Sequence, residues 1–319
     1  MKHLDKRMTK LTALIMTAVM LVVLASSCAI GEGSHGIAYK VTGGKNDMVV
    51  LGSIHVGNED MYPLSDALQE AIAAADTLIF ECDSESAEVM SMMLELMYYP
   101  KGETLQDHVS KETYALLKEA LQATGYSVGV FNAFRPWAVS STFALITTAL
   151  EMGVDDITKA SELGVESQII QLAKDDGKAV GYLETAELQL QMMNDFSPDL
   201  QEYMLQTTCE ELLSDPEEVA ENSEIKYWPS WWRDGDVDSF VQSYLVSMQE
   251  DPMPELMEEY HYALVTERNG NMAEGIRALL ESDEPHSYFV TVGLLHLVLP
   301  EDSVMYELQK MGYTVEKLN

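Results

Sequence analysis

Hydrophobic and polar positions along the chain predict an α/β layer at its start. Two short β-rich runs, residues 37–41 and 48–52, flank turn-forming residues at 43–46, which indicates a hairpin. Apolar residues then recur at spacings of three and four over residues 63–75, so a helix is predicted there. The apolar run 77–81 predicts a short buried strand. The order strand, strand, helix, strand is typical of an α/β layer.

Helical periodicity dominates the middle of the chain, and strand patterns return at its end. Further strands are expected at residues 178–183, 288–293 and 313–318. The other helices are expected at residues 111–123, 136–150, 162–175, 198–213, 236–248, 254–267 and 303–311. We therefore predict an α/β (mixed α+β) fold in one domain, residues 37–319. Its central sheet is assembled from N- and C-terminal strands, with a large helical insertion between them.

The N-terminal segment predicts export. Basic residues crowd the first ten positions, an apolar run follows at residues 11–24, and small residues lead to Cys28. That order is typical of a signal peptide, and the run is shorter than the roughly 20 residues of a membrane span. The Ala-Ser-Ser-Cys ending is similar to a bacterial lipobox, which implies a lipid on Cys28. We expect a signal peptide at residues 1–27, a lipid-anchored tether at 28–36 and attachment to the outside of the cell membrane; ordinary secretion is the alternative.

Composition excludes one class of partner. The chain of 319 residues has 19 Lys and Arg against 53 Asp and Glu, a formal net charge of −34. Such a charge opposes binding to phosphate backbones, so nucleic acid is not an expected partner.

The cysteines and the oligomeric state stay open. With Cys28 lipidated, Cys82 and Cys209 remain, and the sequence does not show whether they pair. It also leaves the oligomeric state open.

A repeated motif marks the candidate chemistry. Gly52 and Gly293 each end an apolar run and are each followed, three residues later, by a histidine, His55 and His296. Glu81 ends the strand predicted at residues 77–81. Carboxyl ends of strands are where open α/β sheets bind ligands, so these three side chains are expected to converge. Two imidazoles and a carboxylate suit a divalent transition metal, or a general base with its orienting partner.

Four other residues near the predicted strand ends are further candidates. Arg268 is expected just after a helix ending near residue 267, where it would either stabilise an oxyanion or form a structural salt bridge. Asp83 is a candidate support for Glu81. Glu184 follows another predicted strand and its role stays open, whereas Thr185 is expected to cap a helix.

Several motifs in fixed order carry a family resemblance. They are LGSIHVG, IFECD, GKAVGYLET, RNGNMAEGI, VTVGLLHL and GYTVEKL, and the match that they mark runs over residues 37–318. The chain resembles the TraB/GumN family, which is related to the TIKI peptidases. The resemblance implies a metal-dependent hydrolase fold whose signature polar residues map to His55, His296 and Glu81. Arg268 and Asn269 match the Arg-Asn pair of the family.

We expect an extracytoplasmic metal-dependent hydrolase that acts on a peptide or a small-molecule substrate. His55, His296 and Glu81 would bind a divalent ion, Mn²⁺, Co²⁺ or Zn²⁺. Glu81 would serve as ligand or as base, and Arg268 would face the developing negative charge. One alternative is a non-catalytic lipoprotein that captures a peptide signal. Another is a metal-independent hydrolase similar to the erythromycin esterases, with His55 or His296 as base and Glu81 orienting it.

Overall fold

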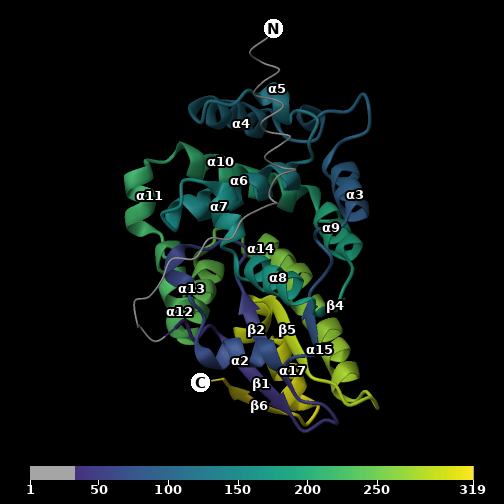
Figure 1. Cartoon of the computed structure of the whole chain (residues 1–319). Helices are drawn as coiled ribbons and strands as arrows, with labels where there is room; N and C mark the ends of the chain where they lie inside the picture. The colour runs from purple at the N-terminus through teal and green to yellow at the C-terminus, as the bar shows by residue number, and fades with distance from the viewer. Residues whose placement is uncertain (1–32, 319) are drawn as a thin grey trace.

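A six-stranded mixed sheet organises the fold in the strand order β4-β3-β5-β2-β1-β6 (Figure 1). The computed structural model describes residues 33–318, so the predicted signal peptide and Cys28 lie outside the described residues. The strands are β1 Ala38–Thr42, β2 Met48–Ser53, β3 Thr77–Phe80, β4 Ala179–Tyr182, β5 Tyr288–Gly293 and β6 Thr314–Lys317. The predicted fold class is confirmed, since strands from both ends of the chain and one from its middle share this sheet.

The direction of the strands fixes where loops can meet. β1 and β2 form the predicted hairpin, with Val41 opposite Met48. β2 pairs in parallel with β5, β5 with β3, and β3 with β4. The carboxyl ends of these four strands therefore lie at one edge of the sheet, and the segments that follow them are neighbours.

Helices make up most of the remaining chain. They are α2 Asp66–Ala74, α3 Ala87–Met97, α4 Lys111–Ala123, α5 Val128–Phe131, α6 Pro136–Glu151, α7 Ile157–Glu162, α8 Val165–Asp176, α9 Ala186–Asn194, α10 Pro198–Leu213, α11 Pro216–Asn222, α12 Trp228–Asp234, α13 Val237–Glu250, α14 Pro254–His261, α15 Glu267–Leu280, α16 Leu295–Val298 and α17 Val304–Lys310. Short 3₁₀ turns are η1 Glu59–Met61, η2 Leu105–Asp107 and η3 Ile225–Tyr227, and η4 Tyr262–Thr266 is a π-helical turn. The helices predicted at residues 111–123 and 198–213 match α4 and α10 residue for residue.

Three predicted helices have a boundary that differs from the structure by three residues or more, whereas the others differ by at most two. The helix expected at residues 162–175 is α8, which begins only at Val165, because Glu162 is the last residue of α7 and Gly164 lies between the two helices. α2 begins after Ser65, whose side chain accepts a hydrogen bond from the Leu68 N–H, rather than at residue 63. The helix expected to end near residue 267 continues, because α14 passes through the π-helical turn η4 directly into α15. Arg268 is therefore in the first turn of α15 and does not follow a helix end.

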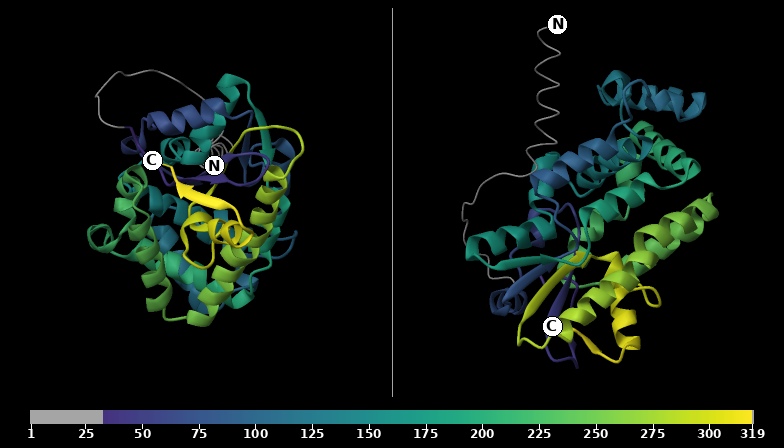
Figure 2. Two further views of the ribbon diagram at one scale, coloured as in Figure 1. Left: turned by 90° about the horizontal axis from the view of Figure 1, so that it is seen from below. Right: turned by 90° about the vertical axis from the view of Figure 1, so that its right-hand side faces the viewer.

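Residues 33–318 form two hydrophobic cores. The larger one lies between the sheet and its covering helices and includes Leu51, Phe80 and Phe289. The second lies within the helical insertion, among α4, α6 and α10, and includes Leu117 and Phe143. Figure 2 shows α4 and α5 at the end of the molecule farthest from the sheet. The insertion thus has a core of its own, which lets it project from the sheet without exposing its apolar faces.

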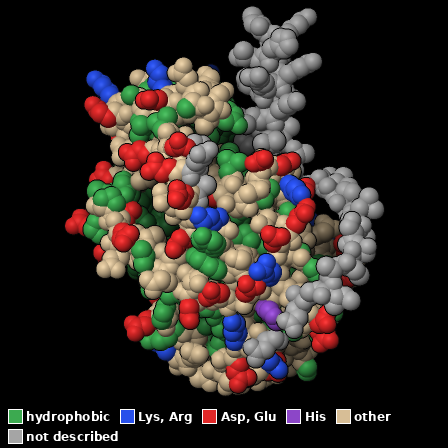
Figure 3. All heavy atoms as spheres, turned by 90° about the vertical axis from the view of Figure 1, so that its left-hand side faces the viewer, with side chains coloured by type: hydrophobic (Ala, Val, Ile, Leu, Met, Phe, Trp, Pro, Cys, Tyr) green, Lys and Arg blue, Asp and Glu red, His purple; other side chains and the backbone are tan. Residues whose placement is uncertain are grey.

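Four further features concern the surface, the cysteines, the start of the described residues and the helices. Acidic side chains are spread over the face shown in Figure 3, with basic side chains scattered among them. Cys82 and Cys209 are both free. Residues 33–36 are already part of the fold, since the Ser34 N–H donates to the carbonyl of Pro63 at 2.7 Å. Within the described residues, no helix combines the length and the apolar character needed to cross a membrane.

Candidate functional site

The structure brings the three predicted residues to one edge of the sheet. Glu81 directly follows β3, His55 follows β2, and His296 lies in α16, just after β5. Because β3, β5 and β2 are neighbours, these positions are adjacent, and the His296 Nε2 lies 3.9 Å from the Glu81 Oε1. His55 is close enough to lower the pKa of both other residues.

Glu81 is a buried and heavily partnered carboxylate. Its Oε1 accepts a hydrogen bond from the Gly293 N–H. Its Oε2 accepts from the Arg268 Nη2 at 2.6 Å and from the Gln189 Nε2 at 3.1 Å. Burial acts to raise the pKa of Glu81, but His296, Arg268 and the Gly293 N–H outweigh it and hold the pKa at about 2. Glu81 is therefore an anion at neutral pH.

Arg268 joins Glu81 to a second carboxylate that sequence reasoning left undecided. Its Nε and Nη2 donate to the Glu184 Oε2 at 3.0 and 2.8 Å. Glu184 follows β4, and its backbone N–H donates to the carbonyl of Glu81 at 2.7 Å. The other carboxylate oxygen, Oε1, is buried and has no hydrogen-bond partner within the described residues. Of the two roles expected for Arg268, the structure shows the structural salt bridge. Its role in stabilising an oxyanion stays a prediction.

His296 is buried and held in one orientation. Its Nδ1 lies 2.7 Å from the Asn269 Oδ1. Asn269 uses its Nδ2 to donate to the carbonyl and the carboxylate of Asp302, so its oxygen faces the imidazole. The Nδ1 must then carry the hydrogen, which leaves a lone pair on Nε2 beside Glu81. Burial is the main cause that lowers the pKa of His296, to about 4, so the ring is neutral at pH 7.

His55 lies on the open side of the site, beside a residue that sequence reasoning missed. Its side chain is 76% exposed, and its Nδ1 lies 3.9 Å from the Oε2 of Glu166, whose side chain is 17% exposed. Burial raises the pKa of Glu166 to about 7, although His55 opposes the shift. Glu166 lies in the first turn of α8, where acidic residues are common, so no motif or strand end marked it.

Asp83, Thr185 and Trp232 have structural roles near the site. Asp83 accepts hydrogen bonds from the backbone of Glu85 and Ser86 and so shapes the turn before α3 instead of contacting Glu81. Thr185 caps α9 as predicted, accepting from the Leu188 N–H at 3.2 Å. Trp232 is fully buried and donates its indole N–H to the carbonyl of Gly52 at 2.7 Å, which supports the strand that leads to His55.

The donor atoms fit a metal ion only in part. Metal–nitrogen and metal–oxygen bonds near 2.1 Å at a tetrahedral angle separate the two donor atoms by about 3.4 Å. The 3.9 Å between the His296 Nε2 and the Glu81 Oε1 is close to that value, and the free lone pair on Nε2 suits a ligand. His55 lies beside Glu166 and does not join His296 and Glu81 as a third ligand. Within residues 33–318, no three His, Cys, Asp or Glu side chains are gathered to hold an ion.

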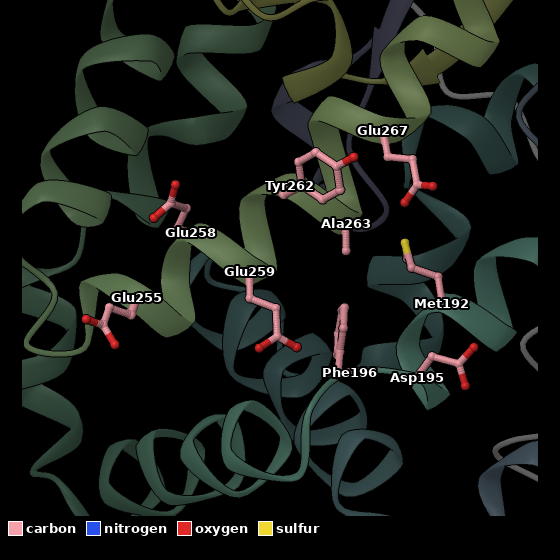
Figure 4. Close-up of a pocket in the computed structure, with 9 residues that line it drawn as sticks. All are labelled: Met192, Asp195, Phe196, Glu255, Glu258, Glu259, Tyr262, Ala263 and Glu267. Atoms are coloured by element: carbon pink, nitrogen blue, oxygen red, sulfur yellow. The ribbon is translucent and has the colours of Figure 1, made fainter.

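A separate cavity lies beside the π-helical turn. It has a volume of about 590 Å³ and contains none of the three predicted residues. Figure 4 shows Met192, Asp195 and Phe196 on one side of it and side chains from α14 and η4 on the other. Glu267, next to Arg268 in the chain, lies on its rim. The cavity is strongly acidic, and it is distinct from the cluster around Glu81.

Fold and site together define a mixed α/β protein with two histidines and buried carboxylates at the carboxyl ends of its parallel strands. Residues 37–317 match the model of the TraB/PrgY/gumN family, and the chain belongs to that family. It is similar to a protein of Escherichia coli (strain K12) described as "Uncharacterized protein YbaP", with 27% identity over 255 residues, covering 80% of this chain and 85% of that protein. The protein of the same description from Shigella flexneri is 27% identical over 249 residues, covering 78% and 83%. No solved structure matches the chain.

Proposed function

We propose that the protein is a metal-dependent hydrolase that acts on peptides. His55, His296 and Glu81 would hold the ion, which would be Mn²⁺, Co²⁺ or Zn²⁺. The observation that carries the proposal is the meeting of His296 and Glu81 at the ends of two paired strands, with His55 close enough to affect the pKa of both. Family membership supports the same site, because all three residues lie within the matched region and the resemblance implies that they are the signature polar residues of the family.

Each neighbouring residue has a task in this proposal. A bound divalent ion would polarise the carbonyl group of the substrate. Asn269 keeps the hydrogen of His296 on Nδ1, so that Nε2 is available as a ligand. Arg268 and the Gly293 N–H keep Glu81 ionised and fixed in place. Arg268 also places a positive charge beside Glu81, where negative charge would develop on the substrate.

We also propose that the protein acts outside the cytoplasmic membrane, anchored by a lipid on Cys28. The support is the order of basic, apolar and small residues before Cys28. In cell fractionation, the parent chain is expected in the membrane fraction. A Cys28→Ser variant, which has no lipid, should be absent from the membrane fraction. If the variant stays in the membrane fraction, the lipid anchor is wrong.

Metal content tests the site directly. The full chain is purified in mild detergent, loaded with Mn²⁺, Co²⁺ or Zn²⁺ and desalted, beside the variants His55→Ala and His296→Ala. The matched control is His108→Ala, because His108 pairs with Glu103 in the helical insertion. The parent and the control should retain about one equivalent of metal. The two site variants should retain little, because a site with so few protein ligands binds weakly once one is removed. Unchanged metal in both site variants would contradict the assignment.

A second candidate is hydrolysis without a metal. The observation that favours it is that His55 lies 3.9 Å from the Glu166 carboxylate, while Glu81 is committed to Arg268. His55 would then act as general base, oriented by Glu166 instead of by Glu81. Activity that resists a chelator would support this candidate, whereas peptide affinity without cleavage products would support a binding protein.

A further inference from the structure

The corner between α7 and α8 is built directly on the loop that carries His55. On one side of His55, the carbonyl of Ile54 accepts a hydrogen bond from the Val165 N–H, the first residue of α8, at 3.0 Å. On the other side, the Gly57 N–H donates to the carbonyl of Ala160 in α7 at 2.9 Å. The loop is therefore tied to both helices by its backbone.

Two glycines allow this close contact. A Cβ atom added at Gly164 would overlap the carbonyl oxygen of His55, and one added at Gly57 would overlap the carbonyl oxygen of Leu163. Tyr62 completes the attachment, since its hydroxyl donates to the same Leu163 carbonyl at 2.8 Å. The corner and the His55 loop thus form one packed unit, in which neither can move without the other.

This unit brings Glu166 to the imidazole of His55. Glu166 is the second residue of α8, immediately after the residue bonded to Ile54. Its carboxylate is mostly buried, whereas the imidazole is mostly exposed, and they face each other across 3.9 Å from Oε2 to Nδ1. The Glu166 carboxylate is thus an ion-pair partner of the imidazole, at a distance longer than a hydrogen bond.

Each of the two histidines has an oxygen acceptor on the side of its Nδ1. For His296 it is the Asn269 oxygen at 2.7 Å, a hydrogen bond, and for His55 it is the Glu166 oxygen at 3.9 Å, which is longer than a hydrogen bond. We propose that Glu166 is a positioning residue: a small rotation of the exposed imidazole lets the carboxylate accept the Nδ1 hydrogen of His55, which leaves the Nε2 lone pair free to serve the site. The inference deepens the proposed function. The effect of Glu166 on the His55 ring does not depend on that function, whereas the role of Nε2 as a metal ligand rests on it.

Supporting partners of this kind set the tautomer and the orientation of a histidine. A carboxylate at Nδ1 also makes Nε2 more basic, which strengthens it as a metal ligand or as a base. Glu166 would therefore matter to either chemistry. The direct consequence is the position of a single hydrogen on the His55 ring.

That hydrogen is observable by ¹⁵N NMR. The full chain is labelled with ¹⁵N-histidine and studied in mild detergent at pH 8, and the His55 signals are assigned by their loss in His55→Gln. The parent should show His55 with its hydrogen on Nδ1. In Glu166→Ala the hydrogen should move to Nε2, which free imidazole prefers, and Glu166→Gln should restore the parent signal because its amide oxygen also accepts. An unchanged His55 signal in Glu166→Ala would overturn the inference.

Zn²⁺ affinity of the same proteins separates this inference from the proposed function. Loss of such a partner typically weakens metal binding by about 10- to 100-fold, and we expect that range for Glu166→Ala. The matched control is Asp175→Asn, which removes an exposed charge from the far end of α8 and should bind as the parent does. A second outcome is that the hydrogen moves to Nε2 in Glu166→Ala while neither Glu166→Ala nor His55→Ala changes the Zn²⁺ affinity. The proposed metal function is then wrong, and the inference that Glu166 positions His55 stands.

Discussion

Arg268 and Glu81 form a buried ion pair, with the Arg268 Nη2 2.6 Å from the Glu81 Oε2 and both side chains at most 10% exposed. The two residues are 187 positions apart in the chain. Glu81 directly follows β3, and Arg268 is the second residue of α15, the helix that returns from the insertion. The pair therefore ties the two parts of the fold together at the point where the candidate site lies.

Removing the guanidinium should destabilise the fold strongly. Arg268→Ala leaves the carboxylates of Glu81 and Glu184 buried without a counter-ion, a change that typically costs roughly 3–5 kcal/mol. Urea unfolding of the variant should show this loss. Arg277→Ala is the control on the same helix, because Arg277 pairs with Glu274 at the surface and its removal should leave the midpoint unchanged. Equal midpoints for both variants would contradict the buried pair.

His296 predicts a loss of stability in acid. Its folded pKa of about 4 lies below the ordinary 6.5, so the unfolded chain binds more protons between these values. The contribution of His296 to the free energy of unfolding is fully present above pH 6.5. It is lost as the pH falls toward 4, by about 3 kcal/mol at most. Unfolding measured at pH 7 and pH 4.5 should show a smaller difference in His296→Gln than in the parent. The exposed His108→Gln should keep the parent difference; a parent-like difference in His296→Gln would refute the prediction.

Glu166 predicts a slope of opposite sign. Its folded pKa of about 7 lies above the ordinary 4.5, so the folded chain binds more protons between these values. This contribution is complete below pH 4.5 and is lost as pH rises toward 7, again by about 3 kcal/mol at most. Glu166→Gln should therefore be more stable than the parent at pH 8, whereas Asp175→Asn should not. A destabilised Glu166→Gln at pH 8 would mean that the carboxylate is not penalised by burial.

Two Gly-to-Ala substitutions should have opposite effects. In Gly164→Ala the new methyl group overlaps the carbonyl of His55, and such overpacking typically costs about 1–3 kcal/mol. In Gly270→Ala, within α15, nothing lies near the added methyl group, and the gain in helix propensity should stabilise by up to about 1 kcal/mol. Thermal unfolding of the two variants distinguishes these signs. A neutral Gly164→Ala would show that the α7–α8 corner does not press on the His55 loop.

The sequence predicted the fold class, most element boundaries and the edge of the sheet where polar side chains meet. Periodicity is a local signal, and it located α4 and α10 residue for residue. Gly and His at a fixed spacing after two strands pointed to His55 and His296, and a strand ending in a carboxylate pointed to Glu81. Parallel strands that end together are a general property of α/β sheets, so their convergence could be expected without a structure.

Only the tertiary structure decided which side chains touch. Arg268 reaches Glu81 and Glu184 because a π-helical turn carries α14 into α15, and the apolar period does not reveal such a turn. Glu166 reaches His55 because two glycines let α8 begin against the His55 loop. The sequence by itself determined which elements form and which residues end the strands, because these depend on neighbours in the chain. The partners of those residues depend on packing between segments 27 to 212 positions apart, which no local pattern records.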